Sequence, residues 1–340
     1  MTILETILGT DDKTEKPAPN SHMKDVLDTL ASLGGKPIET LSPEEARKQP
    51  TPADAVKRVL MKSGKEPTPD GGVTTHEITI QGAAGALPAR VYRPTGSEDE
   101  KLPVIVYWHG GGWVIANIDV YDASPRTLAK MAKAVVVSCE YRLAPEHKFP
   151  AAHDDAFAAY KWVLANAGAF GGDAGNIAIV GESAGGNLAA NVAIAARDAG
   201  ITAPKHMVLV YPVAGNDMNT KSYLQNADAK PLSKPMMEWF VKQVFESKDQ
   251  TSDPRLNLIS ANLSGLPGAT IILAEIDPLR SEGRALAKRL EDAGGDVTCE
   301  IYDGVTHEFF GMGLVVDQAA DAEKLAAKNL KKAFGTDTFF

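Results

Sequence analysis

The residues with the clearest chemical potential lie in the run GESAG, which begins at Gly181 and holds Ser183 at its centre. An apolar, strand-like stretch (176–180) precedes this run, and an alanine-rich helical stretch follows it. A serine in a G-x-S-x-G turn between a strand and a helix is typical of a nucleophile held in strained backbone. Glycine at 181 and 185 fits, because side chains there would collide with neighbouring backbone. The pattern predicts a nucleophilic Ser183 hydroxyl beside a helix N-terminus that favours negative charge.

A second glycine-rich run, HGGGW at 109–113, ends the strand-like stretch 103–108. Consecutive glycines let the backbone approach a ligand closely and turn its N–H groups toward it. An HGGG loop builds the oxyanion hole beside a G-x-S-x-G serine in lipases and esterases. A phosphate-binding loop is the alternative, but the run 181–186 continues with Asn187 where a P-loop needs lysine. The two glycine motifs together predict acyl transfer at a serine.

Ser183 needs a base to accept its proton. Where a G-x-S-x-G serine is the nucleophile, the acid and then the histidine follow it along the chain. Two histidines follow Ser183. His206 opens a strand-like run, which favours a structural role, whereas His307 is expected in a loop after the strand 296–302. His307 is therefore the predicted base.

The base needs an acid to orient it. Asp277 follows the predicted strand 269–276 directly, so its side chain is expected at the same sheet edge as His307. Asp303 is a competitor, but it is expected to lie too close to His307 in the loop. Glu275 is a second competitor, placed inside the strand. Asp277 is the predicted acid.

Strand-like and helix-like stretches alternate from about residue 75 onward. Such alternation predicts a mostly parallel sheet with helices on both faces. The predicted strands are 76–80, 87–93, 103–108, 134–139, 176–180, 206–211, 269–276 and 296–302. The predicted helices of this part are 153–167, a stretch from about 183 to 200, and 317–334.

Two amphipathic helices are expected before the first strand. Apolar residues recur with helical spacing in MKDVLDTLASLGG, and TPAD at 51–54 is typical of a helix N-terminus. The predicted organisation is a flexible tail at 1–22, N-terminal cap helices at 23–70, and a catalytic domain at 71–340. The run 20–23 resembles a cloning junction. The interval 214–268 is too long for one crossover loop and contains KPMMEWFVKQVF, so a cap insertion is expected at about 214–252.

Composition excludes several classes of protein. The chain has 340 residues, with 35 Lys and Arg against 44 Asp and Glu and a net charge of −9, and no basic cluster that would predict nucleic-acid binding. It has no apolar stretch of 18 residues, so no membrane span is expected. Its first residues lack a signal-peptide pattern, which predicts a cytoplasmic location. Cys139 and Cys299 have no metal-ligand spacing and are expected to be reduced thiols, and no metal or cofactor is predicted.

The motifs resemble those of the hormone-sensitive-lipase-type (bacterial family IV) carboxylesterases of the α/β-hydrolase superfamily. Five stretches over about residues 103–310 carry the resemblance, in the family's order: HGGGWVIANID, YRLAPEHKFPAAHDD, GESAGGNLAA, DPLRSEG and GVTHEFF. The resemblance implies an α/β-hydrolase fold, with a mostly parallel central sheet, helices on both faces and a helical cap.

The resemblance also implies roles for single residues. The catalytic group would be Ser183 as nucleophile, Asp277 as acid and His307 as base. The oxyanion hole would be formed by N–H groups of Gly111, Gly112 and Ala184. His109 would be a structural residue of its loop. Beside these implied roles, Trp113 and Glu182 are assigned to substrate binding, with packing under the cap as the alternative for Trp113.

Three positions depart from the family's motifs. Glu182 replaces the usual aspartate before the nucleophile, Ser281 stands where aspartate is common, and Glu308 follows His307 where glycine is common. None of them removes a catalytic group.

The predicted function is a serine carboxylesterase that hydrolyses short- to medium-chain acyl esters of small molecules through an acyl-enzyme. An amidase or lipase with the same triad is one alternative, and a non-catalytic small-molecule receptor on this fold is another. The presence of His307 disfavours the receptor. The family resemblance and the usual size of a capped pocket predict acyl chains of about two to eight carbons. The sequence is compatible with a homodimer.

Overall fold

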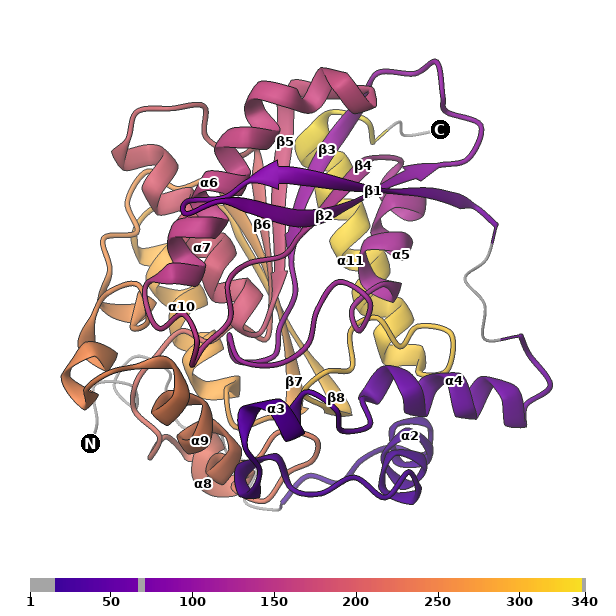
Figure 1. The fold of residues 1–340 in the computed structure, drawn as a ribbon, viewed down its shortest axis with the longest axis vertical. Helices are drawn as coiled ribbons and strands as arrows, with labels where there is room; N and C mark the ends of the chain where they lie inside the picture. The colour runs from indigo at the N-terminus through magenta and orange to yellow at the C-terminus, as the bar shows by residue number, and fades with distance from the viewer. Residues whose placement is uncertain (1–15, 67–70, 338–340) are drawn as a thin grey trace.

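An eight-stranded sheet forms the centre of the computed structural model, which describes residues 16–66 and 71–337 (Figure 1). The strand order is β1-β2-β4-β3-β5-β6-β7-β8. β2 (Ala86–Pro94) is antiparallel to both of its neighbours, and the strands from β4 to β8 run parallel. The other strands are β1 (Val73–Gln81), β3 (Leu102–Trp108), β4 (Val135–Cys139), β5 (Gly172–Glu182), β6 (His206–Val210), β7 (Gly268–Ile276) and β8 (Val297–Thr306). The mostly parallel sheet predicted from the sequence is confirmed.

The central strands are apolar at nearly every position because both faces of the sheet are covered. All seven residues of β3 are buried. Val104 and Val106 belong to one hydrophobic cluster, whereas Ile105 and Tyr107 belong to the other. Successive side chains of a strand point to opposite faces, so one short apolar run contributes to two separate cores.

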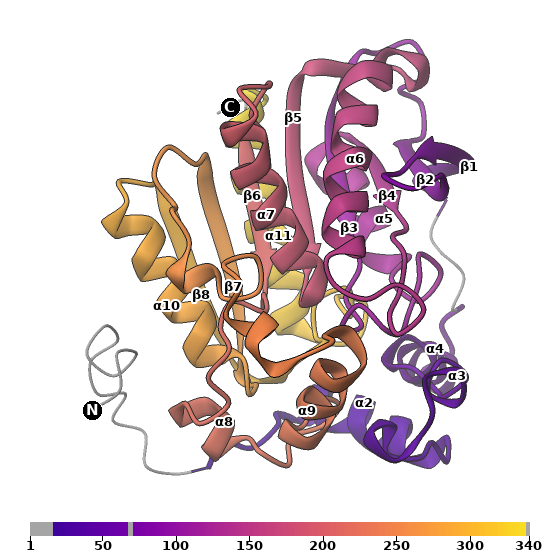
Figure 2. The same ribbon diagram turned by 60° about the vertical axis from the view of Figure 1, so that its left-hand side comes forward.

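Helices cover the two faces of the sheet (Figure 2). One face carries α6 (Ala151–Asn166), α7 (Ala184–Asp198) and α10 (Arg280–Asp292), and the other carries α5 (Ala123–Ala132) and α11 (Asp317–Phe334). Neither α5 nor α10 is among the helices predicted from the sequence. Helix α5 buries one side only, and α10 carries charged residues in every turn, so neither has the long apolar signal of α7.

Strand β8 is longer than predicted and runs to Thr306. Its register against β7 shifts between Ala274 and Ile276, which marks a bulge. His307 therefore follows the strand directly, instead of lying in a separate loop after residue 302. This correction places the histidine at the carboxyl edge of the sheet.

Two segments lie together beyond the carboxyl ends of the strands (Figures 1 and 2). The first contains α2 (Ser21–Ser32), α3 (Pro43–Ala46) and α4 (Pro52–Lys62), and the second contains α8 (Lys221–Gln225) and α9 (Lys234–Val244). Short 3-10 helices complete the fold at Ile38–Thr40, Ala167–Phe170, Lys248–Ser252 and Leu258–Ser260.

Helix α2 begins two residues before the predicted start. The Asn20 side chain accepts a hydrogen bond from the Met23 N–H at 2.9 Å, and the Asn20 N–H donates to the Gly304 carbonyl, also at 2.9 Å. Residues 20–22 are thus part of the fold rather than of the predicted tail. Residues 1–15 of that tail lie outside the described residues.

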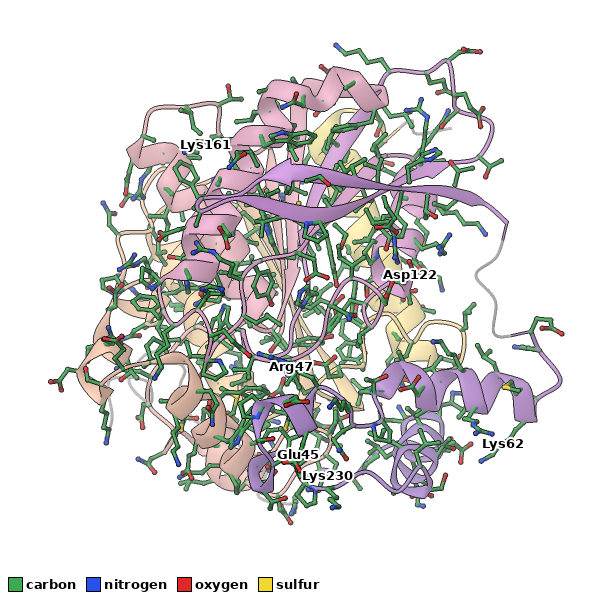
Figure 3. The ribbon with its side chains drawn as sticks, viewed as in Figure 1. Glu45, Arg47, Lys62, Asp122, Lys161 and Lys230 are labelled. Atoms are coloured by element: carbon green, nitrogen blue, oxygen red, sulfur yellow. The ribbon has the colours of Figure 1, made fainter. Side chains whose placement is uncertain are left out.

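The N-terminal segment is joined to the rest of the protein through Arg47, labelled in Figure 3 at the end of α3. Its guanidinium donates to the carbonyls of Val114 and Ala144, each at 2.8 Å. The Trp239 Nε1–H of α9 donates to the Leu41 carbonyl at 3.1 Å. The two segments therefore contact each other as well as the loop that follows β3.

Candidate active site

Ser183 occupies a strained turn between β5 and α7. Its backbone has φ 56° and ψ −117°, in the region that non-glycine residues rarely adopt. A Cβ added at Gly181 would lie 2.0 Å from the Gly185 carbonyl oxygen, and one added at Gly185 would lie 2.0 Å from that of Trp108. The steric reason predicted for both glycines is confirmed. Ser183 is the N-cap residue of α7, yet its side chain caps no N–H, so Oγ is available to other groups.

Ser183, His307 and Asp277 form a continuous hydrogen-bonded chain. His307 Nε2 lies 2.9 Å from Ser183 Oγ, and His307 Nδ1 lies 2.6 Å from Asp277 Oδ2. The other carboxylate oxygen, Asp277 Oδ1, accepts the Leu279 N–H at 2.8 Å. The three residues follow β5, β8 and β7, whose carboxyl ends meet at one edge of the parallel sheet. The structure thus brings together the three residues that their order along the chain predicted.

The two competing carboxylates lie elsewhere. Glu275 accepts the Gly304 N–H at 2.8 Å and so helps to hold the bulged part of β8. Asp303 lies within β8 rather than in a loop. Neither of them is hydrogen-bonded to His307, whose Nδ1 is occupied by Asp277.

The glycine-rich loop after β3 turns sharply beside Ser183. Gly111 has φ 94°, and a Cβ there would lie 2.2 Å from the Ile115 carbonyl oxygen. Gly112 has φ 59°, and a Cβ there would lie 2.3 Å from the Phe240 ring of α9. Among the described residues, the N–H groups of Gly111, Gly112 and Ala184 donate to no protein atom. These N–H groups are free to bind an oxygen of a ligand.

His109 is a structural residue of this loop. It is fully buried, and its Nε2 lies 3.1 Å from Glu140 Oε2. Glu140 also accepts the Ile118 N–H at 2.8 Å. Burial alone would raise the pKa of Glu140, but the hydrogen bond and charge of His109 lower it below its usual value. The contacts of Glu140 with His109 and with Ile118 join the two sides of the glycine loop.

Glu182 does not contact the predicted substrate site. Its side chain is fully buried and accepts hydrogen bonds from Tyr107 at 2.6 Å and Tyr211 at 2.5 Å. Burial raises its pKa to about 7, although hydrogen bonds from Ser124 and the two tyrosines hold the pKa down. The expectation that Glu182 binds substrate is wrong, because the carboxylate points into the protein beneath the serine.

The pKa of His307 is raised above its ordinary value. Burial alone would lower it, but the charge and hydrogen bond of Asp277 outweigh burial, and the charges of Glu308 and Glu182 add to the effect. The Tyr211 ring packs against the imidazole with centroids 4.4 Å apart. The imidazolium is thus favoured by negative groups on several strands.

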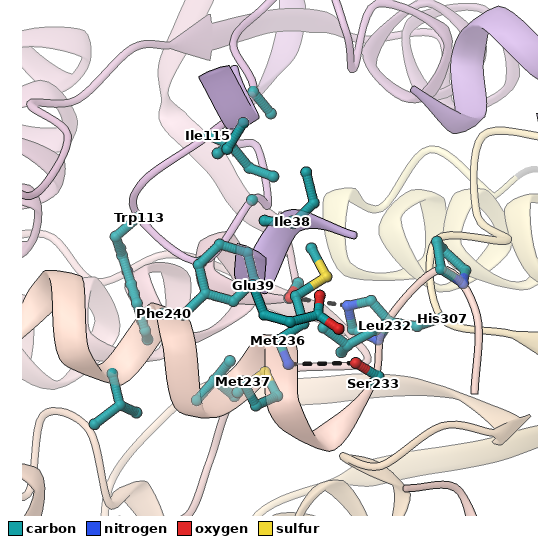
Figure 4. Close-up of a pocket in the computed structure, with 18 of the residues that line it drawn as sticks. Ile38, Glu39, Trp113, Ile115, Leu232, Ser233, Met236, Met237, Phe240 and His307 are labelled. Atoms are coloured by element: carbon teal, nitrogen blue, oxygen red, sulfur yellow. Dashed lines mark hydrogen bonds between the residues drawn. The ribbon is translucent and has the colours of Figure 1, made fainter. Parts of the chain in front are cut away.

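A cavity of about 1600 Å³ opens above Ser183 and His307. Its walls come from the glycine loop and from both segments beyond the strand ends (Figure 4). The apolar part of the wall includes Ile38, Trp113, Ile115, Leu232, Met236, Met237 and Phe240. Trp113 is only 4% exposed, so it packs in the core while its remaining surface faces the cavity.

The cavity wall contains two functional candidates that received no role in the sequence analysis. Tyr121, from the loop before α5, lines the cavity together with Glu308. The tyrosine hydroxyl donates to the Glu308 carboxylate. Its oxygen lies 2.6 Å from Glu308 Oε1 and 2.7 Å from Oε2. The departure from glycine after His307 was the available signal for Glu308, whereas no sequence pattern indicated Tyr121.

Within residues 16–66 and 71–337, no three His, Cys, Asp or Glu side chains gather as metal ligands would. Cys139 is buried and Cys299 is half-buried, and both are free thiols. Among the described helices, none combines the length and apolar character that a membrane crossing requires.

A parallel sheet that carries a strained serine, a histidine and an acid at its carboxyl edge defines the α/β-hydrolase class. The family model described as "alpha/beta hydrolase fold" matches residues 105–311. The carboxylesterase NlhH of Mycobacterium tuberculosis is 41% identical over 251 residues, which are 73% of this chain and 78% of the relative. The ethyl acetate hydrolase of Pseudomonas putida is 34% identical over 303 residues, 87% of this chain and 92% of the relative. The chain belongs to the α/β-hydrolase family, in its hormone-sensitive-lipase-type branch.

Solved structures give the same result. An esterase from Pyrobaculum calidifontis superposes with a TM-score of 0.80 at 38% identity, over 90% of this chain and 96% of the other. An ester-hydrolase from the metagenome of Lake Arreo, solved with a derivative of bipyridine phosphonate, gives a TM-score of 0.83 at 37% identity. That comparison covers 94% of this chain and 100% of the other. The similarity therefore includes the segments beyond the strand ends as well as the sheet.

Proposed function

We propose that this protein is a serine carboxylesterase that hydrolyses short- to medium-chain acyl esters through an acyl-enzyme. The hydrogen-bonded chain from Ser183 through His307 to Asp277 is the observation that carries the proposal. Relatives named as carboxylesterases and ester hydrolases support it. The intact base disfavours the receptor alternative. Turnover of p-nitrophenyl butyrate by the purified protein is the first test.

In acylation, Ser183 Oγ attacks the ester carbonyl carbon while its proton passes to His307 Nε2. The carbonyl oxygen becomes an oxyanion, for which Gly111, Gly112 and Ala184 supply N–H groups. Ala184 is the first residue of α7, so the helix dipole adds to this stabilisation. When the tetrahedral intermediate collapses, the imidazolium gives its proton to the departing alcohol oxygen.

In deacylation, a water molecule takes the place of the alcohol. His307 removes its proton, the water oxygen attacks the acyl carbon, and the carboxylic acid leaves as Ser183 regains the proton. Asp277 holds the imidazole in the tautomer with hydrogen on Nδ1, so that Nε2 is free to accept a proton in both half-reactions.

We expect kcat/KM to rise with pH as His307 loses its proton, with a midpoint above the ordinary histidine value of about 6.5. The cause is the raised pKa of His307, which Asp277, Glu308 and Glu182 favour through their negative charge. In Glu182→Gln one of these charges is gone, so the midpoint should move to lower pH. A pH–rate profile with p-nitrophenyl butyrate measures the midpoint.

The control for this profile is Glu300→Gln, which removes a carboxylate from the exposed side of β8. Its midpoint should match that of the unmodified protein. An unchanged midpoint in Glu182→Gln would show that the charge of Glu182 does not reach His307.

We further propose that the two segments beyond the strand ends form a cap that limits acyl length. Activity on p-nitrophenyl esters should fall for chains longer than about eight carbons, because the wall encloses the acyl group. Met236 lies in this wall (Figure 4). Met236→Ala should raise the ratio of ten-carbon to four-carbon turnover about tenfold, since the shorter side chain lengthens the pocket.

Met61 provides a matched control for the length experiment. It is 57% exposed on α4 and does not line the cavity. Met61→Ala should leave the length profile unchanged. Equal profiles for Met236→Ala and the unmodified protein would mean that another part of the wall sets the limit.

A further inference from the structure

Glu308 places a carboxylate beside the reacting atoms. It follows His307 with a backbone φ of 71°, and its Oε1 lies 3.9 Å from His307 Nε2. Its side chain is 21% exposed and forms part of the wall of the cavity above Ser183. The hydroxyl of Tyr121 donates to both carboxylate oxygens and holds the group in this position.

The negative charge of Glu308 has little nearby compensation. Among the described residues, His307 is the only basic side chain within 4.0 Å of its carboxylate. The titratable groups that face it from the surrounding elements are Tyr107 in β3, His109 in the loop after β3, Tyr121, Tyr141 after β4, Glu182 at the end of β5, Tyr211 after β6 and Asp277 after β7. No lysine or arginine is in this group. Burial raises the pKa of Glu308, while the charge of His307 and the Tyr121 hydrogen bond hold it down.

We propose that Glu308 makes the site selective for esters whose alcohol carries a positively charged nitrogen. The inference rests on the proposed esterase function and names its substrate class. The departing alcohol oxygen must come within about 3 Å of His307 Nε2 to receive its proton. Because Glu308 Oε1 lies 3.9 Å from the same nitrogen, the alcohol oxygen and the carboxylate are at most about 7 Å apart. A cationic nitrogen two carbons from that oxygen can reach the carboxylate.

The negative charge of Glu308 should affect acylation and not deacylation. A cation on the alcohol is attracted to the cavity and held there until the alcohol leaves. After the alcohol has left, the acyl-enzyme is the same for every ester of one acid. Selection by Glu308 therefore acts on kcat/KM, which reports acylation, and not on the rate of deacylation. Alcohols that carry a carboxylate should be rejected by the same charge.

Two esters of equal shape separate charge from size. Butyrylcholine has a trimethylammonium group where 3,3-dimethylbutyl butyrate has a tert-butyl group, and both form the butyryl-enzyme. The ratio of their kcat/KM values measures selection by charge within one preparation of enzyme, so a general loss of activity cancels. We expect the ratio to fall about tenfold in Glu308→Gln, which keeps the shape of the side chain and removes its charge. Glu238→Gln removes a carboxylate from an exposed position of α9 at the same cavity and should keep the ratio.

The pH dependence gives a second measurement that needs no variant. Neither ester changes its charge between pH 5 and 8, so a change in their ratio reports ionisation of the protein. The ratio should rise with pH in the unmodified protein as Glu308 ionises, and it should stay flat in Glu308→Gln.

The outcomes separate the two proposals. Hydrolysis of the neutral ester with a ratio that neither rises with pH nor falls in Glu308→Gln would overturn the selectivity and leave the esterase function standing. An equal fall in Glu238→Gln would show that the selection is not local to Glu308, which also overturns it. If p-nitrophenyl butyrate and both butyrates are left intact, the proposed function itself fails, and the inference with it.

Discussion

Replacing Ser183 by alanine is expected to lower kcat/KM for p-nitrophenyl butyrate by about 10⁴-fold or more. The variant loses the hydroxyl that His307 Nε2 activates for acylation, and water is left as the attacking group. The fold should persist, because Oγ caps no N–H of α7 and alanine already occupies left-handed backbone at Ala116. Initial-rate kinetics and the melting temperature measure the two parts of this expectation.

Two further measurements make the Ser183 prediction specific. A fluorophosphonate should label Ser183 in the unmodified protein and leave Ser183→Ala unlabelled, as peptide mapping can show. Ser138→Ala is the matched control, since that serine is buried in β4 and its hydroxyl has no hydrogen-bond partner among the described residues. Its activity should be close to that of the unmodified protein. An adduct on a serine other than Ser183 would contradict the assignment.

Asp277→Asn is expected to have the second largest effect, a loss of up to about 10⁴-fold in kcat. The Leu279 N–H donates to Oδ1, so the amide of asparagine must place its oxygen there and its NH₂ group toward His307. That NH₂ group donates to Nδ1, which forces the ring hydrogen onto Nε2. A protonated Nε2 cannot accept the proton of Ser183. The geometry around the acid thus predicts a wrong tautomer rather than a misplaced ring.

Asp303→Asn is the matched control for Asp277→Asn. Asp303 lies in β8 and does not contact His307, so its variant should lose little activity. Single-turnover kinetics should place the loss in Asp277→Asn in the chemical steps, with the melting temperature only slightly changed. A larger loss in Asp303→Asn than in Asp277→Asn would mean that Asp303 orients the base in solution.

The features that depend on local sterics and on apolar periodicity could be predicted from the sequence. Gly181 and Gly185 had to be glycine because a Cβ at either position would enter backbone of the same turn or of β3, and that collision can be anticipated from the motif. The order of strands and helices followed from apolar periodicity. Because parallel strands end at one edge, the positions of Asp277 and His307 after their predicted strands were enough to place both near Ser183.

The directions of the carboxylates of Glu182 and Glu308 could not be predicted, because they depend on contacts made in the folded protein. Glu182 is adjacent to Ser183 in sequence, yet Tyr107 of β3 and Tyr211, which follows β6, hold its side chain beneath the sheet edge. Glu308 is adjacent to His307, yet Tyr121, 187 positions earlier in the chain, fixes it in the cavity wall. Each glutamate is adjacent in sequence to a residue of the catalytic group, yet Glu182 points away from the cavity and Glu308 lines it. Their directions depend on partners from distant segments, and a pattern read along the chain contains no information about which distant side chain will be within hydrogen-bonding distance.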